Sequence, residues 1–174
     1  MKKVIILMLI LALVGRCSHK QKNKDIPAHE LDGYIDSFVR DMSGKVPTTS
    51  RNKMSMKFSD LEGNTVGLCT YTDVFGHTRV EFDRKAWNNY SKMERLELAY
   101  HEFSHALCNL PHSWEGGIYP EASKSGIKSS GLAEDGYYDD FCPVSIMHPY
   151  TIEDSCLKKH WGEYIKDLRD RCFP

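Results

Sequence analysis

The sequence predicts a mixed α+β fold in which a small twisted sheet packs on a central helix. Between positions 54 and 82, short segments alternate apolar and polar residues, which is typical of half-buried strands. The segment from Ser91 to Leu110 repeats apolar residues every three or four positions, as an amphipathic helix does. A second helical pattern, from about Glu153 to Arg171, closes the chain.

The N-terminal residues 1–17 have the pattern of an export signal. Lys2 and Lys3 precede an unbroken apolar run from Val4 to Val14, which is too short to span a bilayer as a stable helix. We therefore expect the protein to be exported.

The end of this signal, LVGRC, resembles a bacterial lipobox. The resemblance implies that Cys17 becomes the lipidated first residue, although Arg16 stands where the lipobox has a small residue. The polar residues 18–26 are then a tether, and residues 27–174 form one domain. We expect a lipoprotein that is anchored to a membrane at Cys17 and faces the periplasm or the cell exterior.

Composition excludes one broad class of partner. The formal net charge is −1, and the body of the chain has no sustained run of Lys and Arg, so no surface for nucleic acid is predicted. With 41% hydrophobic and 27% charged residues, the 174-residue chain has an ordinary globular composition. We expect a monomer.

Apolar spacing places the first elements of the domain. A helix begins near Pro27, with its apolar stripe at Leu31, Ile35, Phe38 and Val39. Three strands follow, with these inward-facing residues: Met54, Met56 and Phe58; Val66, Leu68 and Thr70; Val80 and Phe82.

The helix from Ser91 to Leu110 has the clearest boundaries. Ser91 and Glu94 form a capping box at its start. Its apolar stripe is Leu96, Ala99, Phe103, Leu107 and Leu110, and we expect this face to pack on the sheet. The Gly- and Ser-rich residues 113–136 are predicted to be a long irregular excursion.

The cysteines point to disulfides without giving their connectivity. The chain has six, and if Cys17 carries lipid, an odd number remains, so one stays unpaired. In a continuous C-terminal helix, Cys156 and Cys172 lie about 24 Å apart. Because a disulfide needs Cα atoms within about 7 Å, these two are predicted not to pair.

The helix from Ser91 to Leu110 carries an HExxH motif. His101 and His105 are four residues apart, so both rings lie on one face and can bind a common ion. This face is roughly opposite the apolar stripe, so we expect it to open on a cleft. Glu102 is placed to act on a metal-bound water as a general base. The predicted cofactor is one catalytic Zn²⁺ ion.

These residues, with SIMHPY at positions 145–150, resemble the metzincin metalloproteases, whose signature is HExxHxxGxxH followed by a Met-turn. The resemblance implies a zincin-like fold, in which the C-terminal helix comes after the Met-turn. It implies that Met147 is the Met-turn residue and that the Val80–Phe82 strand is the edge strand that pairs with a peptide. Tyr150 resembles a tyrosine that stabilises the transition state in some members, although it lies one residue further along.

The third zinc ligand departs from the metzincin spacing. Pro111 stands where the family has its third histidine, and His112 follows it. Asn109 lies three residues before His112, as the family glycine does before its ligand, and Asn tolerates the left-handed conformation that ends a helix. His112 is therefore the expected third ligand. The alternatives are Cys108, Glu115, Glu121, Glu134 and Asp135.

The sequence thus predicts a zinc-dependent endopeptidase. A different function remains open: a non-catalytic lipoprotein that is stabilised by zinc and acts as a binding or adhesion module. In a structural zinc site a fourth protein ligand completes the coordination of the ion, whereas a catalytic zinc site keeps one coordination position open for water.

Overall fold

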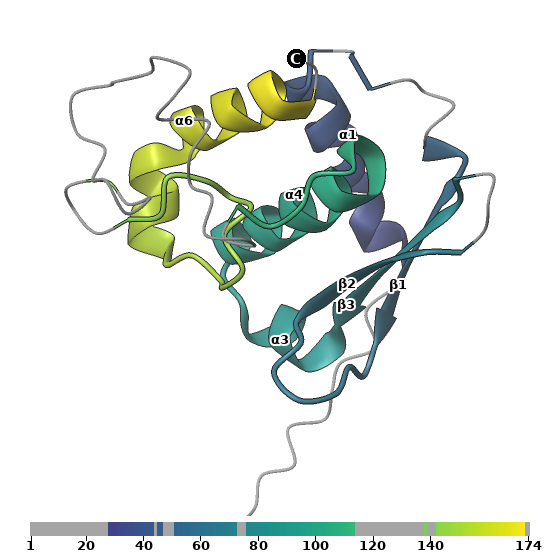
Figure 1. Cartoon of the computed structure of the whole chain (residues 1–174). Helices are drawn as coiled ribbons and strands as arrows, with labels where there is room; N and C mark the ends of the chain where they lie inside the picture. The colour runs from purple at the N-terminus through teal and green to yellow at the C-terminus, as the bar shows by residue number, and fades with distance from the viewer. Residues whose placement is uncertain are drawn as a thin grey trace, which may run out of the picture.

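The computed structural model describes residues 28–43, 45–46, 51–72, 76–113, 138 and 142–172. The predicted export signal, the tether and nearly all of the excursion after Ser113 lie outside these residues. Among the helices described, none has the length and apolarity needed to cross a membrane. The predicted mixed α+β class is confirmed, with three strands preceding the two longest helices (Figure 1).

The first helix forms as its spacing predicts. A 3-10 turn, η1 (Ala28–Leu31), leads into α1 (Asp32–Asp41). Leu31, Ile35 and Phe38 are fully buried, and Val39 packs at the edge of the core. This stripe lies against α4, the helix that carries the HExxH motif.

The sheet has the order β1-β3-β2, with β1 (Met54–Ser59), β2 (Gly67–Tyr71) and β3 (Thr78–Asp83). β3 pairs in parallel with β1 and antiparallel with β2. The prediction that Val80–Phe82 is an edge strand is therefore wrong, because Val80 pairs with Met56 on one side and Cys69 on the other. Among the described strands, β2 is the edge that lies against α4.

The predicted inner face of β2 is also wrong. Cys69 lies opposite Val80 in the ladder, and opposite residues share a face of the sheet. Since Val80 is fully buried, Cys69 turns towards the core while Leu68 is 43% exposed. The inner row of β2 is therefore Gly67, Cys69 and Tyr71, one residue out of phase with the apolar alternation.

A short helix between the sheet and α4 was not expected from the sequence. α3 (Arg84–Asn89) begins at Asp83, whose side chain accepts a hydrogen bond from the Ala86 amide at 2.7 Å. Its Trp87 is fully buried and packs edge-on against Phe58 at a centroid distance of 5.3 Å. Asp83 is a favoured N-cap residue and was the signal available for this helix.

α4 (Lys92–Cys108) is the central element (Figure 1). The capping box of Ser91 and Glu94 forms as predicted. The helix contacts α1, β2, β3 and α6, so every residue from Glu97 to Ser104 is buried. The expected cleft is present on the face that carries His105, which lines a pocket, whereas His101 is only 7% exposed and is not among the residues that line it.

The C-terminal helix α6 (Asp154–Cys172) packs on α4 and is joined to its end by a disulfide. Cys108 is bonded to Cys172, and Cys142 to Cys156. The prediction that Cys156 and Cys172 do not pair is confirmed. Cys69 is the free thiol among the described cysteines.

Loss of the Cys108–Cys172 disulfide is expected to lower the free energy of unfolding by about 2–5 kcal/mol, because the bond closes a long loop in the unfolded chain. Urea unfolding of a Cys108→Ala/Cys172→Ala variant measures this loss. Cys69→Ser is the control, since it removes no disulfide. Non-reducing peptide mapping that found either cysteine linked elsewhere would contradict the pairing.

Candidate metal centre

Three histidines converge at the end of α4, as the sequence predicts. The Nε2 atoms of His101 and His105 are 3.1 Å apart, and the Nε2 atom of His112 lies 3.0 Å and 3.2 Å from them, respectively. In a tetrahedral zinc site with Zn–N bonds of 2.0–2.1 Å, nitrogen ligands lie about 3.3 Å apart. The three atoms are therefore spaced to bind one such ion.

Backbone carbonyls fix the orientation of two of these rings. The Nδ1 atom of His101 lies 2.8 Å from the Ile146 oxygen, and that of His105 lies 2.5 Å from the Leu110 oxygen. A carbonyl only accepts, so in the neutral ring each Nδ1 carries the proton and each Nε2 presents a lone pair. Two lone pairs 3.1 Å apart repel each other, and a cation between them turns that repulsion into coordination.

Burial favours this neutral form at the first histidine. Desolvation, followed by the nearby charge of His105, lowers the pKa of His101 to about 3. A neutral imidazole is the form that coordinates a metal ion. The residues present therefore fit a zinc ion.

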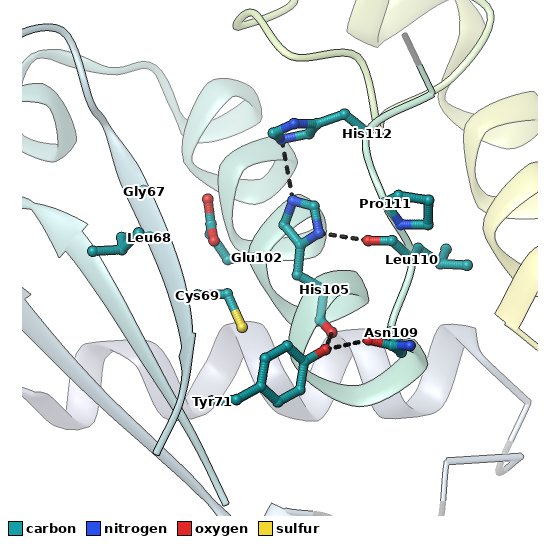
Figure 2. A pocket seen from close by; sticks show the side chains of 10 residues that line it. All are labelled: Gly67, Leu68, Cys69, Tyr71, Glu102, His105, Asn109, Leu110, Pro111 and His112. Atoms are coloured by element: carbon teal, nitrogen blue, oxygen red, sulfur yellow. Dashed lines mark hydrogen bonds between the residues drawn. The ribbon is translucent and has the colours of Figure 1, made fainter. Parts of the chain in front are cut away.

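The left-handed turn that brings His112 back forms at Asn109, as predicted. Asn109 caps α4 with φ 53° and ψ 34°, and its amide donates to the His105 oxygen at 3.1 Å. The Tyr71 hydroxyl from β2 lies 2.6 Å from the Asn109 Oδ1 atom and 3.0 Å from the same His105 oxygen (Figure 2). The strand thus holds the turn in place.

The segment around Met147 supports the site through its backbone. Met147 is fully buried, and its oxygen accepts a hydrogen bond at 2.9 Å from the amide of Ser113, the residue after His112. The preceding carbonyl, of Ile146, contacts His101. Two consecutive peptide groups therefore link both ends of the histidine cluster.

Glu102 lies beside the three histidines and is not one of the converging ligands. It is only 4% exposed, and its Oε2 atom has no hydrogen-bond partner within the described part of the chain. Burial raises the pKa of this carboxyl to about 8. A cation bound nearby would lower that pKa again by electrostatic attraction.

Glu102 opens on a pocket of about 570 Å³ between β2 and the end of α4. Figure 2 shows its carboxylate between the backbone of β2 and the His105 ring. Burial, and then the charge of Glu102, raises the pKa of the Cys69 thiol in this pocket to about 11. The lining residues are Gly67, Leu68, Cys69, Tyr71, Glu102, His105, Asn109, Leu110, Pro111 and His112.

The other predicted site residues divide into three groups. Cys108 is excluded as a ligand, because its sulfur is bonded to Cys172. Tyr150 is 73% exposed and does not line the pocket. The four acidic alternatives lie outside the described residues: Glu115, Glu121, Glu134 and Asp135.

Several residues of the site were missed by sequence reasoning. The inner row of β2 lines the pocket, but the apolar alternation of that strand pointed to the opposite face. His148 is 6% exposed and close enough to His101 for its charge to contribute to the lowered pKa of that ring. The carbonyl partners Ile146 and Leu110 have no sequence signal, because any residue supplies a backbone oxygen.

Comparison with known proteins identifies no relative of this chain. No family model, curated protein or solved structure matches it.

The turn at Asn109 gives a test of how His112 is placed. Asn109→Gly keeps the left-handed conformation and is expected to keep Zn²⁺ affinity, whereas Asn109→Val is strained there by about 1–2 kcal/mol and loses about 5–30-fold. Tyr71→Phe removes the hydroxyl that bonds Asn109 but leaves the residue at position 109 unchanged, so it tests the hydrogen bond separately from the left-handed conformation. Competition with a chromogenic zinc chelator measures all three. Equal affinity in Asn109→Val and the wild type would show that the turn does not position the ligand.

Proposed function

We propose that this protein is a zinc-dependent endopeptidase in which Glu102 is the general base. The observation that carries the proposal is the convergence of three Nε2 atoms beside a buried carboxylate without a hydrogen-bond partner in the described residues. No fourth protein ligand joins the cluster among those residues, which is the pattern of a catalytic zinc.

The chemistry divides between the ion and the chain. His101, His105 and His112 would hold a zinc ion, which when bound would supply acidification of a water and polarisation of the scissile carbonyl. Glu102 accepts the proton of the attacking water and delivers it to the departing amine nitrogen, so one peptide bond and one water become a carboxylic acid and an amine. The Ile146 and Leu110 carbonyls keep two imidazoles in the tautomer that coordinates.

The metzincin resemblance supports this proposal. The described elements follow the expected order of helix, strands, HExxH helix, buried Met147 turn and final helix. The left-handed residue stands three positions before the third histidine, as the signature requires. The zincin-like fold is therefore part of the proposal, as is export to the membrane surface through the signal that ends at Cys17.

An extended peptide substrate is expected to lie along β2. β2 lines the pocket and pairs with a strand on one side only in the described part of the sheet. Leu68 and Tyr71 on this strand are 43% and 53% exposed, although both are large and apolar. Backbone pairing with an edge strand provides affinity that does not depend on substrate sequence.

Glu102→Gln is expected to bind one Zn²⁺ ion as the wild type does and to lose about 10²–10⁴-fold in kcat/KM, the usual contribution of a general base. Hydrolysis of a mixed peptide library, followed by mass spectrometry, measures the loss. Glu163→Gln, on the exposed face of α6, is the matched control. Equal cleavage by Glu102→Gln would end the catalytic interpretation. A zinc-loaded wild type that cleaves nothing would favour the binding module.

His112→Ala is expected to weaken Zn²⁺ binding by more than the roughly 100-fold that loss of a supporting hydrogen bond costs, since a direct ligand is removed. Zinc titration against a competing chelator measures the change. His29→Ala, at an exposed position in η1, is the control. Full affinity in His112→Ala would transfer the third-ligand role to one of the acidic alternatives.

A further inference from the structure

One glycine lies directly against the proposed general base. A methyl group placed on Gly67 of β2 would lie 2.7 Å from the Glu102 Cδ atom and 2.9 Å from its Cγ atom, and closer still to Oε1. These distances are shorter than real carbon contacts allow. The other described glycines have open space at that point: Gly33, Gly63, Gly76 and Gly162.

The backbone does not require glycine at this position. Among the described glycines, those with positive φ are Gly63 and Gly76, whereas Gly67 lies in an ordinary strand. Gly67 costs the strand some stability, because glycine is entropically unfavourable in β-structure. What the chain gains at Gly67 is therefore space for the Glu102 carboxyl group.

Neither the Glu102 side chain nor the β2 backbone at Gly67 can move away from the other easily. Glu102 is 4% exposed on a helix whose neighbouring residues are all buried. On the other side, β2 is paired with β3, where Gly67 lies opposite Phe82, and the Asp83 amide donates to the Val66 oxygen at 2.8 Å. The carboxylate is confined between the strand backbone and the His105 ring (Figure 2).

The inner row of β2 increases in size along the strand. Gly67 has no side chain where β2 faces Glu102, Cys69 follows with a small one, and Tyr71 extends a full ring to reach Asn109. At Gly67 the space beside the strand backbone is therefore occupied by the Glu102 carboxyl group, whereas at Tyr71 the strand reaches the end of α4 through its own side chain.

We propose that Gly67 is a positioning residue for Glu102: its missing side chain creates the space that keeps the carboxylate beside the three-histidine cluster. The inference deepens the proposed function and rests on it for its catalytic consequence. A methyl group at position 67 rotates the carboxylate out of this space, and a displacement of about 1 Å at a reacting group costs about 100-fold in rate. His101 and His105 keep their carbonyl partners, so we expect metal binding to be unaffected.

The catalytic test is Gly67→Ala. We expect kcat to fall by about 100-fold, with KM for a cleaved peptide and Zn²⁺ affinity both within about threefold of the wild type. A defect in folding alone would lower the active fraction and the bound zinc together, and zinc content measured on the same sample separates the two. Gly162→Ala is the control, because its added methyl group meets nothing within 4 Å.

A thermal test needs neither activity nor metal. Gly67→Ala is expected to lower Tm by about 3–10 °C in the wild-type background, as overpacking does in a domain of this size. In the Glu102→Ala background the Cγ, Cδ and carboxylate atoms are gone, so the same change is expected to cost less than half as much. This coupling is the signature of the contact.

Each outcome bears on the proposal. Equal Tm losses in both backgrounds, or unchanged kcat in Gly67→Ala, would overturn it. If Gly67→Ala does not fold, recovery of folding with Glu102→Ala supports the contact, and failure in both overturns it. If the wild type cleaves no peptide but the thermal coupling is present, the positioning of Glu102 by Gly67 stands and the proposed peptidase activity falls.

Discussion

The convergence of three histidine side chains at the end of α4 is the constraint on which the rest of the site depends. His101 and His105 are held from behind by fixed carbonyls, so their Nε2 lone pairs face each other at 3.1 Å. The rings keep this orientation only where the surrounding structure prevents them from turning away. The fold around α4 has to supply that constraint.

Both ends of α4 are fixed by contacts with other elements. At its start, Ser91 accepts from the Glu94 amide and also bonds Asp154 at the beginning of α6. At its end, Cys108 is bonded to Cys172 at the other end of α6. The two long helices are therefore joined at both ends. As a result, His101 and His105 cannot shift along the axis of α4 relative to the segment around Met147 that precedes α6.

The sequence predicts well the features that neighbouring residues determine, such as helix caps and turns. It misses the features that depend on pairing between distant segments, such as strand register and disulfides. The capping box and the Asn109 turn follow from spacings within a few residues, so α4 and the place of His112 were predictable. The face of β2 depends on its register with β3, in which Cys69 meets Val80, and the position of β3 depends on two partners. Neither register nor disulfide connectivity has a local signal, which is why the sequence predicts Leu68 to face inward and does not indicate the space at Gly67.

The end of α4 combines a disulfide and a left-handed turn at two adjacent residues. Cys108 is the last residue of α4 and is bonded to Cys172 of α6. Asn109, the next residue, adopts the left-handed conformation that ends the helix. Unlike glycine, Asn109 has a side chain, and its Oδ1 atom meets the Tyr71 hydroxyl at 2.6 Å. The same strand that leaves room for Glu102 at Gly67 therefore fixes the turn before His112, so β2 helps to place both the proposed base and the proposed third ligand.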